Sequence, residues 1–187
     1  MQQEEFHIGG LIKKMMHEEG RSVPWLASKI QCNRRNIYDI FSRSSMDTAQ
    51  LLKISIALKI NFFAYYSDIY EKKMNNKTEY VESNTLYLIP QGEIHIGSLI
   101  KKRFEEKERS VEWLAKNIGC QPRNIYDIFN NRTSMDTTQL LSISLTLSTN
   151  LFDYLSDIYK YTVSKQRTLK LRRQTENTHE TICSVWF

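Results

Sequence analysis

The sequence predicts an all-α protein made of two tandem domains, each containing five helices. The chain of 187 residues contains only 6 Gly and 3 Pro, and an all-β domain with its many turns usually needs more of both. The chain also repeats itself, because residues 3–41 align with 91–129 with 25 identical pairs of 39, and residues 45–70 align with 134–159 with 17 of 26. Within each copy the apolar residues recur at the spacing of amphipathic helices.

The repeat divides the chain into four parts. We expect a first domain over residues 3–72, a linker over 73–90, a second domain over 91–160 and a basic C-terminal tail over 161–187. Two copies are fewer than the units of a solenoid. The linker contains an apolar run over residues 86–89, which predicts a short strand or a plug between the domains. We expect the tail to be either a basic arm against DNA or a mobile terminus, and its last residues, 182–187, are apolar enough to dock on a surface.

The first three helices of the first copy have separate signals. Apolar residues at i, i+3, i+4 and i+7 predict the first helix: Ile8, Leu11, Ile12 and Met15. The second helix begins after Ser22, a natural N-cap, and Pro24 falls early, where a missing N–H costs little. Asn33 is a candidate cap for the third helix. The residues that we expect to face inward from this helix are Ile37, Ile40 and Phe41.

The fourth and fifth helices follow from a cap and from aromatic content. Asp47 begins the fourth helix, and Gln50 three residues later predicts a capping box. The fifth helix runs from Phe62 to Tyr70. Its tyrosines and those of its counterpart are candidates for exposed positions, where they would offer a surface for a homodimer or a partner protein: Tyr65, Tyr66, Tyr70, Tyr154 and Tyr159.

The second and third helices of each copy carry the functional signal. In a twenty-residue window that starts at Val23, a small residue stands at position five, a turn residue at nine, and isoleucine at fifteen and eighteen. These positions hold Ala27, Gln31, Ile37 and Ile40 in the first copy and Ala115, Gly119, Ile125 and Ile128 in the second. The pattern resembles the phage-repressor-like (Xre-type) helix-turn-helix family, and the resemblance covers both copies almost end to end. Gln31 stands where the family usually has glycine, which implies a slightly different turn in the first copy.

The resemblance implies a bacterial or phage-type transcriptional regulator in the cytoplasm, associated with the nucleoid, that binds double-stranded DNA as a covalent pseudo-dimer. In that family the second helix lies across the DNA backbone and the third enters the major groove. The candidate DNA-binding residues of the first copy are Arg21, Ser22, Asn33, Arg34, Arg35, Asn36, Tyr38, Asp39 and Arg43. Those of the second copy are Arg109, Ser110, Gln121, Arg123, Asn124, Tyr126, Asp127 and Arg132.

These residue types suit base and phosphate recognition. Arginine donates two hydrogen bonds to guanine, and asparagine reads adenine. The free N–H groups at the start of a helix, after Ser22 or Ser110, suit a phosphate. Since Pro122 replaces Arg34 in the second copy, the two copies should read different bases, and the target should be an imperfect repeat.

Each candidate also has a structural interpretation. Arg35 and Asp39 stand at i and i+4, as do Arg123 and Asp127, and either pair is equally explained as an ion pair on a solvated helix face. Tyr38 and its counterpart Tyr126 are either exposed contacts or partly buried core residues.

The net charge of +5 is divided unevenly. Residues 7–72 hold ten basic and six acidic side chains, residues 95–160 hold nine and eight, and residues 161–187 hold five and two. The second copy also has an acidic run over residues 105–108. The first copy is therefore the better DNA anchor. The alternative function is a protein-interaction module, such as an antitoxin or assembly factor, that uses the same fold without specific DNA readout.

Other chemistries have little support in the sequence. Cys32 and Cys120 occupy the same turn position without metal-ligand spacing, so we expect buried packing roles. We expect His7 and His95 to pack or cap at the start of the first helices. No catalytic or cofactor-binding motif is present, so we expect neither an enzyme nor a cofactor. No run approaches about 18 apolar residues and no signal peptide is visible, so no membrane association is expected.

Overall fold

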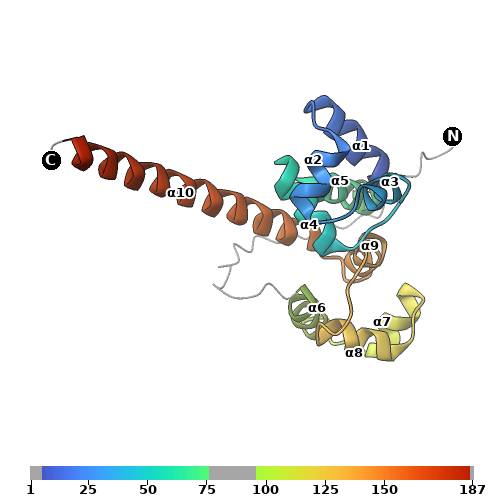
Figure 1. The fold of residues 1–187 in the computed structure, drawn as a ribbon. Coiled ribbons are helices and arrows are strands. Elements are labelled where there is room, and N and C mark those ends of the chain that lie inside the picture. Colours follow the sequence, from blue (N-terminus) through green and yellow to red (C-terminus); the bar gives the residue numbers. More distant parts are fainter. Residues whose placement is uncertain (1–5, 76–95, 186–187) are drawn as a thin grey trace.

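A computed structural model describes residues 6–75 and 96–185 of the chain, with side chains for 6–74 and 96–169. Within these ranges the protein is all-α, with ten helices and no strand (Figure 1). The helices of the first repeat are α1 (Ile8–Glu18), α2 (Val23–Ile30), α3 (Arg34–Phe41), α4 (Thr48–Leu58) and α5 (Phe62–Asn75). Those of the second repeat are α6 (Ile96–Glu105), α7 (Val111–Ile118), α8 (Pro122–Phe129), α9 (Thr137–Thr146) and α10 (Leu151–Val185). The apolar run at 86–89 lies outside the described residues.

The core of each repeat forms where its first four helices meet. In the first repeat α1 packs on α3, and α2 packs on both α3 and α4. Ile8 and Ile12 are fully buried, as the spacing predicts, whereas Leu11 and Met15 are half-buried. Met16 is also fully buried, so the apolar face of α1 is shifted by part of a turn from the predicted face.

The predicted helix caps are present with two exceptions. The Ser22 hydroxyl accepts a hydrogen bond from the Trp25 N–H at 3.4 Å. The Asp47 carboxylate accepts from the Gln50 N–H at 2.8 Å, but only the second repeat forms the complete reciprocal capping box, between Asp136 and Gln139. The prediction for Asn33 is wrong in part, because it is the N-cap residue of α3 by backbone geometry but its side chain makes no capping hydrogen bond.

The histidine at the start of α1 has the expected capping role. The Nδ1 atom of His7 accepts a hydrogen bond from the Gly10 N–H at 2.9 Å. This bond satisfies one of the N–H groups that the first turn of a helix leaves without an internal partner. His95 lies outside the described residues.

The two repeats pack on each other through equivalent segments. The Thr48 N–H donates to the Met135 carbonyl at 2.9 Å, and the Thr137 N–H donates to the Met46 carbonyl at 2.9 Å. Because position 46 corresponds to 135 and position 48 to 137, each repeat contributes the same groups to this contact. Such reciprocal pairing is the property of a two-fold interface, here formed within one chain.

The two fifth helices extend this contact. α5 packs on α10 and on α9 of the second repeat, and α10 packs in turn on α4 of the first. The rings of Tyr66 and Phe152 stack with centroids 4.9 Å apart. The Ser67 hydroxyl donates to an Asp153 carboxylate oxygen at 2.8 Å.

The prediction that the tyrosines of these helices are exposed is wrong for three of the five. Tyr66, Tyr70 and Tyr159 are buried, and Tyr65 and Tyr154 are half-buried. The reason is that each fifth helix is covered by the other repeat as well as by its own. The apolar side of each fifth helix that its own repeat leaves uncovered is therefore covered by the other repeat.

Residues 161–185 of the expected tail continue the last helix. α10 runs without interruption from Leu151 to Val185, so it extends well past residue 160, where the second repeat ends. Figure 1 shows its C-terminal part projecting away from the other helices.

Candidate nucleic-acid interface

A tight turn joins α2 to α3 and, in the same way, α7 to α8. The first turn residue, Gln31 or Gly119, has a left-handed backbone, with φ of 56° and 74° respectively. The prediction of a different turn in the first repeat is therefore wrong, because glutamine adopts the conformation that glycine adopts in the second. The next N–H then closes the end of the helix. Cys32 donates to the Ala27 carbonyl, and Cys120 donates to the Ala115 carbonyl, each at 2.9 Å.

The turn orients α3 with one apolar side inward and one polar side outward. Ile37 and Ile40 are buried against α1 and α2. The residues on the other sides are all exposed: Arg34, Arg35, Asn36, Tyr38 and Asp39. Tyr38 is 62% exposed, so the interpretation of this side chain as a core residue is wrong. Its ring touches Phe41 edge-on, with the centroids 6.2 Å apart.

α8 presents the corresponding residues with two differences. Gln121, Arg123 and Asn124 are exposed, and Tyr126 is 50% exposed. Asp127, in contrast, is half-buried, whereas its counterpart in α3 is exposed. Pro122 begins α8 where α3 begins with an arginine, so α8 offers one cation fewer.

The arginines on these two helices are not held by the acidic residues one turn away. Within the described residues, neither Arg35 with Asp39 nor Arg123 with Asp127 forms an ion pair. The alternative interpretation of these residues as pairs on a solvated face is therefore wrong. Their guanidinium groups remain available to an external acceptor.

The N-terminal ends of α2 and α7 are more occupied than the sequence suggests. The hydroxyls of Ser22 and Ser110 cap their helices by accepting from the N–H of Trp25 and Trp113. Pro24 has no N–H, so the first turn of α2 has few donors left for a phosphate. The corresponding turn of α7 contains Glu112, whose charge opposes a phosphate.

Four arginines flank these helices. Arg21 lies over the Trp25 ring at 4.7 Å from its centroid, and Arg109 lies over the Trp113 ring at 5.5 Å. Arg43 and Arg132 follow α3 and α8 and are both exposed. All of the predicted site residues except the half-buried Asp127 are therefore exposed, and they are divided between the two repeats.

The two turn cysteines are less buried than the sequence predicts, and each thiol makes a hydrogen bond. Cys32 and Cys120 are half-buried, and each thiol donates to the carbonyl of the next residue at 3.5 Å. Burial raises the pKa of both thiols, which keeps them in the protonated, unreactive form.

In the part of the chain that the structure describes, His, Cys, Asp and Glu nowhere gather in a group that would hold a metal ion. No helix there is long and apolar enough to span a membrane.

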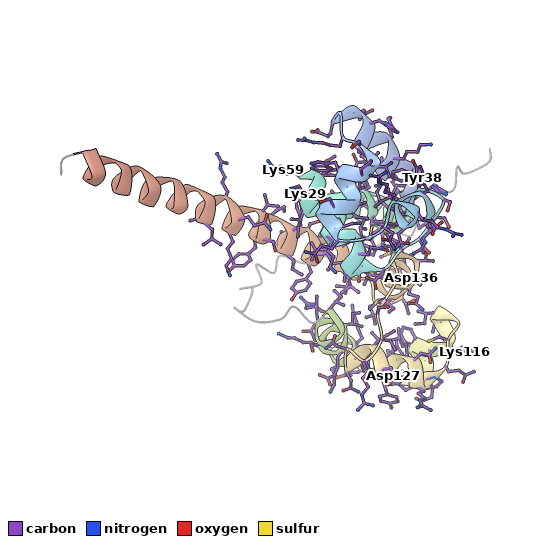
Figure 2. The ribbon with its side chains drawn as sticks, in the orientation of Figure 1. Lys29, Tyr38, Lys59, Lys116, Asp127 and Asp136 are labelled. Atoms are coloured by element: carbon purple, nitrogen blue, oxygen red, sulfur yellow. The ribbon has the colours of Figure 1, made fainter. Side chains whose placement is uncertain are left out.

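Sequence reasoning missed a second charged surface on the first repeat. Lys29, Lys53 and Lys59 lie together beside α10, and the residues at these positions in the second repeat are Asn117, Ser142 and Ser148. In the sequence, only the uneven charge of the two repeats points to this surface. The charge count does not locate the cluster, because the lysines come from two different helical segments. Figure 2 shows Lys29 and Lys59 on the side of the first repeat opposite Tyr38.

Comparison of the chain with models of protein families, with curated proteins and with solved structures finds no match.

Proposed function

We propose that each repeat is a helix-turn-helix domain of the phage-repressor type, and that the chain binds double-stranded DNA sequence-specifically as a covalent pseudo-dimer. α3 and α8 are the recognition helices of this proposal. The protein then acts as a transcriptional regulator in the bacterial cytoplasm. The observation that carries the proposal is the pair of arginines, Arg35 and Arg123, exposed at equivalent places on α3 and α8 without an ion-pair partner among the described residues.

The packing of the repeats also supports this proposal. The reciprocal contacts between Met46–Thr48 and Met135–Thr137 pair equivalent segments of the two repeats, which is the pattern of an approximate two-fold axis. DNA-binding dimers use such symmetry to read two half-sites along one face of a duplex. A chain that contains both halves has no dissociation step, so its affinity for DNA is independent of a monomer–dimer equilibrium.

The proposed readout differs between the two halves. Arg34 at the start of α3 is replaced by Pro122 in α8, which removes a charge and all donors at that position. Asp127 is less exposed than Asp39. We therefore expect selection from random duplexes to return two related but unequal half-sites. Enrichment of two identical half-sites contradicts this.

The test of DNA readout is the same selection with the variant Arg35→Ala, Arg123→Ala. An arginine that contacts guanine with two hydrogen bonds contributes about 1–3 kcal/mol, so each substitution should weaken binding to the selected site by roughly 5- to 150-fold. Neither side chain is buried or ion-paired, so the variant should unfold at the same temperature as the wild type, measured by circular dichroism.

The control is a variant with the same change in charge outside the proposed interface, Lys13→Ala, Lys72→Ala. Both residues are exposed. This variant should select the wild-type sequence with nearly wild-type affinity. The readout proposal fails if the wild type enriches no sequence, or if the double arginine variant enriches the same sequence at undiminished strength.

Salt dependence separates DNA binding from the alternative of a protein-interaction module. Binding through several phosphates weakens steeply between low and physiological salt, because bound counterions are released. An aromatic protein interface responds little to salt. Tyr66, Tyr70 and Tyr159 are buried, so three of the five tyrosines that favoured the alternative are not on the surface.

A further inference from the structure

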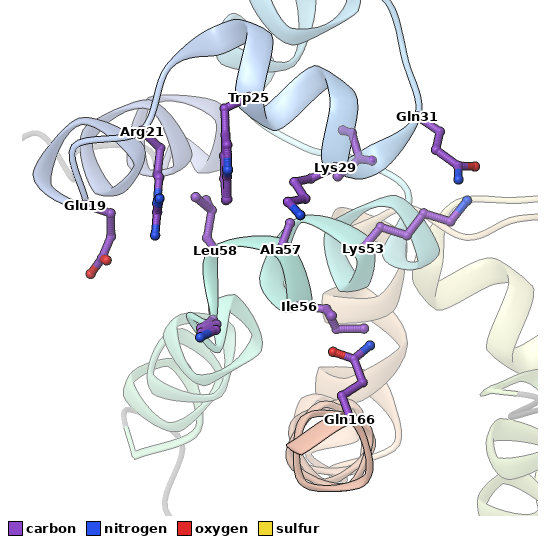
Figure 3. Close-up of a pocket in the computed structure, with 12 residues that line it drawn as sticks. Glu19, Arg21, Trp25, Lys29, Gln31, Lys53, Ile56, Ala57, Leu58 and Gln166 are labelled. Atoms are coloured by element: carbon purple, nitrogen blue, oxygen red, sulfur yellow. The ribbon is translucent and has the colours of Figure 1, made fainter. Parts of the chain in front are cut away.

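A groove of about 950 Å³ lies on the first repeat beside α10. Its walls come from the segment before α2, from α2 itself, from the C-terminal half of α4, and from Gln166 of α10. Figure 3 shows Arg21 and Trp25 side by side, Lys29 reaching down from α2, and Gln166 rising from α10 below. A volume of this size is at the upper end of the range for ligand-binding clefts.

Four cations surround the groove against one carboxylate. The cations are Arg21, Lys29, Lys53 and Lys59, and the carboxylate is Glu19. Within the described residues none of these five side chains forms an ion pair. Like charges that gather without compensation raise the potential of a concave surface and attract an anionic partner.

The floor of the groove is apolar. Trp25, Ile30, Ile56 and Ala57 line it and are half-buried. One face of the Trp25 ring is covered by the Arg21 guanidinium, which leaves the guanidinium edges free to donate hydrogen bonds. The groove therefore combines cations at its rim with an apolar surface between them.

Helix-end electrostatics account for only two of the four cations. Lys29 is in the last turn of α2, and Lys59 is the C-cap of α4, so both stabilise a helix C-terminus. Lys53, however, is in the middle of α4. The second repeat ends the equivalent helices with Asn117 and Ser148 instead, so the fold does not require lysine at these positions.

We infer that this groove binds an acidic, amphipathic peptide segment of a partner protein. The four rim cations match several carboxylates spaced along a chain, and the apolar floor matches leucine-like side chains between them. A nucleic-acid backbone satisfies the cations but leaves the floor without an apolar partner. Lys29 and Lys59 lie on the opposite side of the repeat from Tyr38 of α3 (Figure 2). Arg21 is the one groove residue that is also a candidate DNA contact, so the test below leaves Arg21 unchanged.

The test compares the full chain with the variant Lys29→Asn, Lys53→Ser, Lys59→Ser, which introduces the residues of the second repeat. All three lysines are exposed, and the second repeat contains the same helices with these residues, so the variant should fold normally. The probe is a fluorescein-labelled peptide in which pairs of glutamates alternate with single leucines, and binding is followed by fluorescence anisotropy. A matched peptide has glutamine in place of glutamate.

We expect saturable binding of the glutamate peptide that the triple variant weakens about tenfold, since three partly exposed ion pairs are lost. The control variant Lys13→Asn, Lys72→Ser, Lys73→Ser removes the same charge outside the groove and should bind like the wild type. The glutamine peptide should bind more weakly than the glutamate peptide.

Three results overturn the inference. The first is failure of the wild type to bind the glutamate peptide, and the second is equal weakening by the two triple variants. The third is displacement of the peptide by a random DNA duplex in the wild type, which identifies the groove as a nucleic-acid surface instead. DNA selection with the groove variant is measured in parallel, so loss of peptide binding and loss of DNA readout are distinguished.

Discussion

Gln31 adopts a left-handed backbone, with φ of 56°, at the position where the second repeat has Gly119. An L-residue with a side chain pays about 1–2 kcal/mol for this conformation, which glycine adopts freely. The same comparison arises in reverse at the end of α1 and α6, where Gly20 has φ of 62° and its counterpart Glu108 has φ of 49°. Each repeat thus carries one strained residue at a turn that the other repeat makes with glycine.

Gln31→Gly is expected to stabilise the protein by about 0.5–1 kcal/mol, because relief of backbone strain exceeds the extra chain entropy of glycine in the unfolded state. The measurement is urea unfolding followed by circular dichroism. Gly119→Gln is the matched reverse change. A Cβ at that position meets no neighbouring atom within 4 Å, so the expected loss of stability comes from backbone conformation. A destabilised Gln31→Gly variant contradicts the assignment of strain.

The approach of the first helix to the third is set by one glycine in each repeat. A Cβ on Gly9 would overlap the carbonyl oxygen of Ile40, and a Cβ on Gly97 would overlap that of Ile128. The N–H of Gly9 donates to the Arg43 carbonyl at 3.0 Å. In the second repeat the one-residue insertion changes this bond, and the Gly97 N–H donates to the Asn131 side chain at 3.1 Å.

Gly9→Ala should therefore destabilise the protein by about 1–3 kcal/mol, as overpacking in a closely fitted contact does. Gly10→Ala is the control, since a Cβ there meets only the His7 ring, at 3.2 Å. This control also gains helix propensity and should be about neutral or slightly stabilising. Thermal unfolding of the two variants compares them directly. Equal stability of both contradicts the close approach of α1 to α3.

The contact between the repeats is symmetric in its backbone and asymmetric in its side chains. The Tyr66 hydroxyl donates to the Thr137 hydroxyl at 2.8 Å, and the residue that corresponds to Tyr66 in the second repeat is Leu155. Phe6 also packs edge-on against Tyr66, with centroids 5.0 Å apart. The buried hydroxyl therefore joins the two repeats on one side of the approximate two-fold axis only.

Ionisation of buried tyrosines should make this contact sensitive to alkali. Burial raises the pKa of Tyr66 to about 12, and burial together with Glu71 and Asp153 raises that of Tyr70 to about 12. The folded state thus favours the neutral phenol. The resulting stability is fully present below the unfolded pKa of 10.0 and is lost as pH rises towards 12. We expect unfolding free energy to be flat up to about pH 10 and then to fall by about 2 kcal/mol per tyrosine.

The variant Tyr66→Phe tests this assignment. At neutral pH it should lose about 1 kcal/mol with the hydrogen bond to Thr137. Between pH 10 and 12 its stability should fall less than that of the wild type, since one ionising group is gone. Parallel pH profiles for the two proteins contradict the role of Tyr66.

Much of the helical architecture follows from local sequence signals. Ile37 and Ile40 mark the buried side of α3, and Ser22 and Asp47 mark helix starts, because caps and apolar spacing act over a few residues. The surface position of Arg35 follows from the same spacing, whereas the sequence left that of Tyr38 open and the tertiary structure decides it. The prediction for Asn33 is wrong in part for a local reason as well. A residue type that favours the N-cap position does not determine whether its side chain makes the capping hydrogen bond.

The all-α class, the internal repeat and the polar outer side of α3 and α8 could be predicted from the residues alone. How the repeats pair, the burial of Tyr66, and the groove that Lys29 and Lys53 share beside α10 emerge only in the folded molecule. This is because periodicity shows which side of a helix is apolar but not which element covers it. Contacts such as that between Tyr66 and Thr137 join residues far apart in the chain, and no local pattern specifies them.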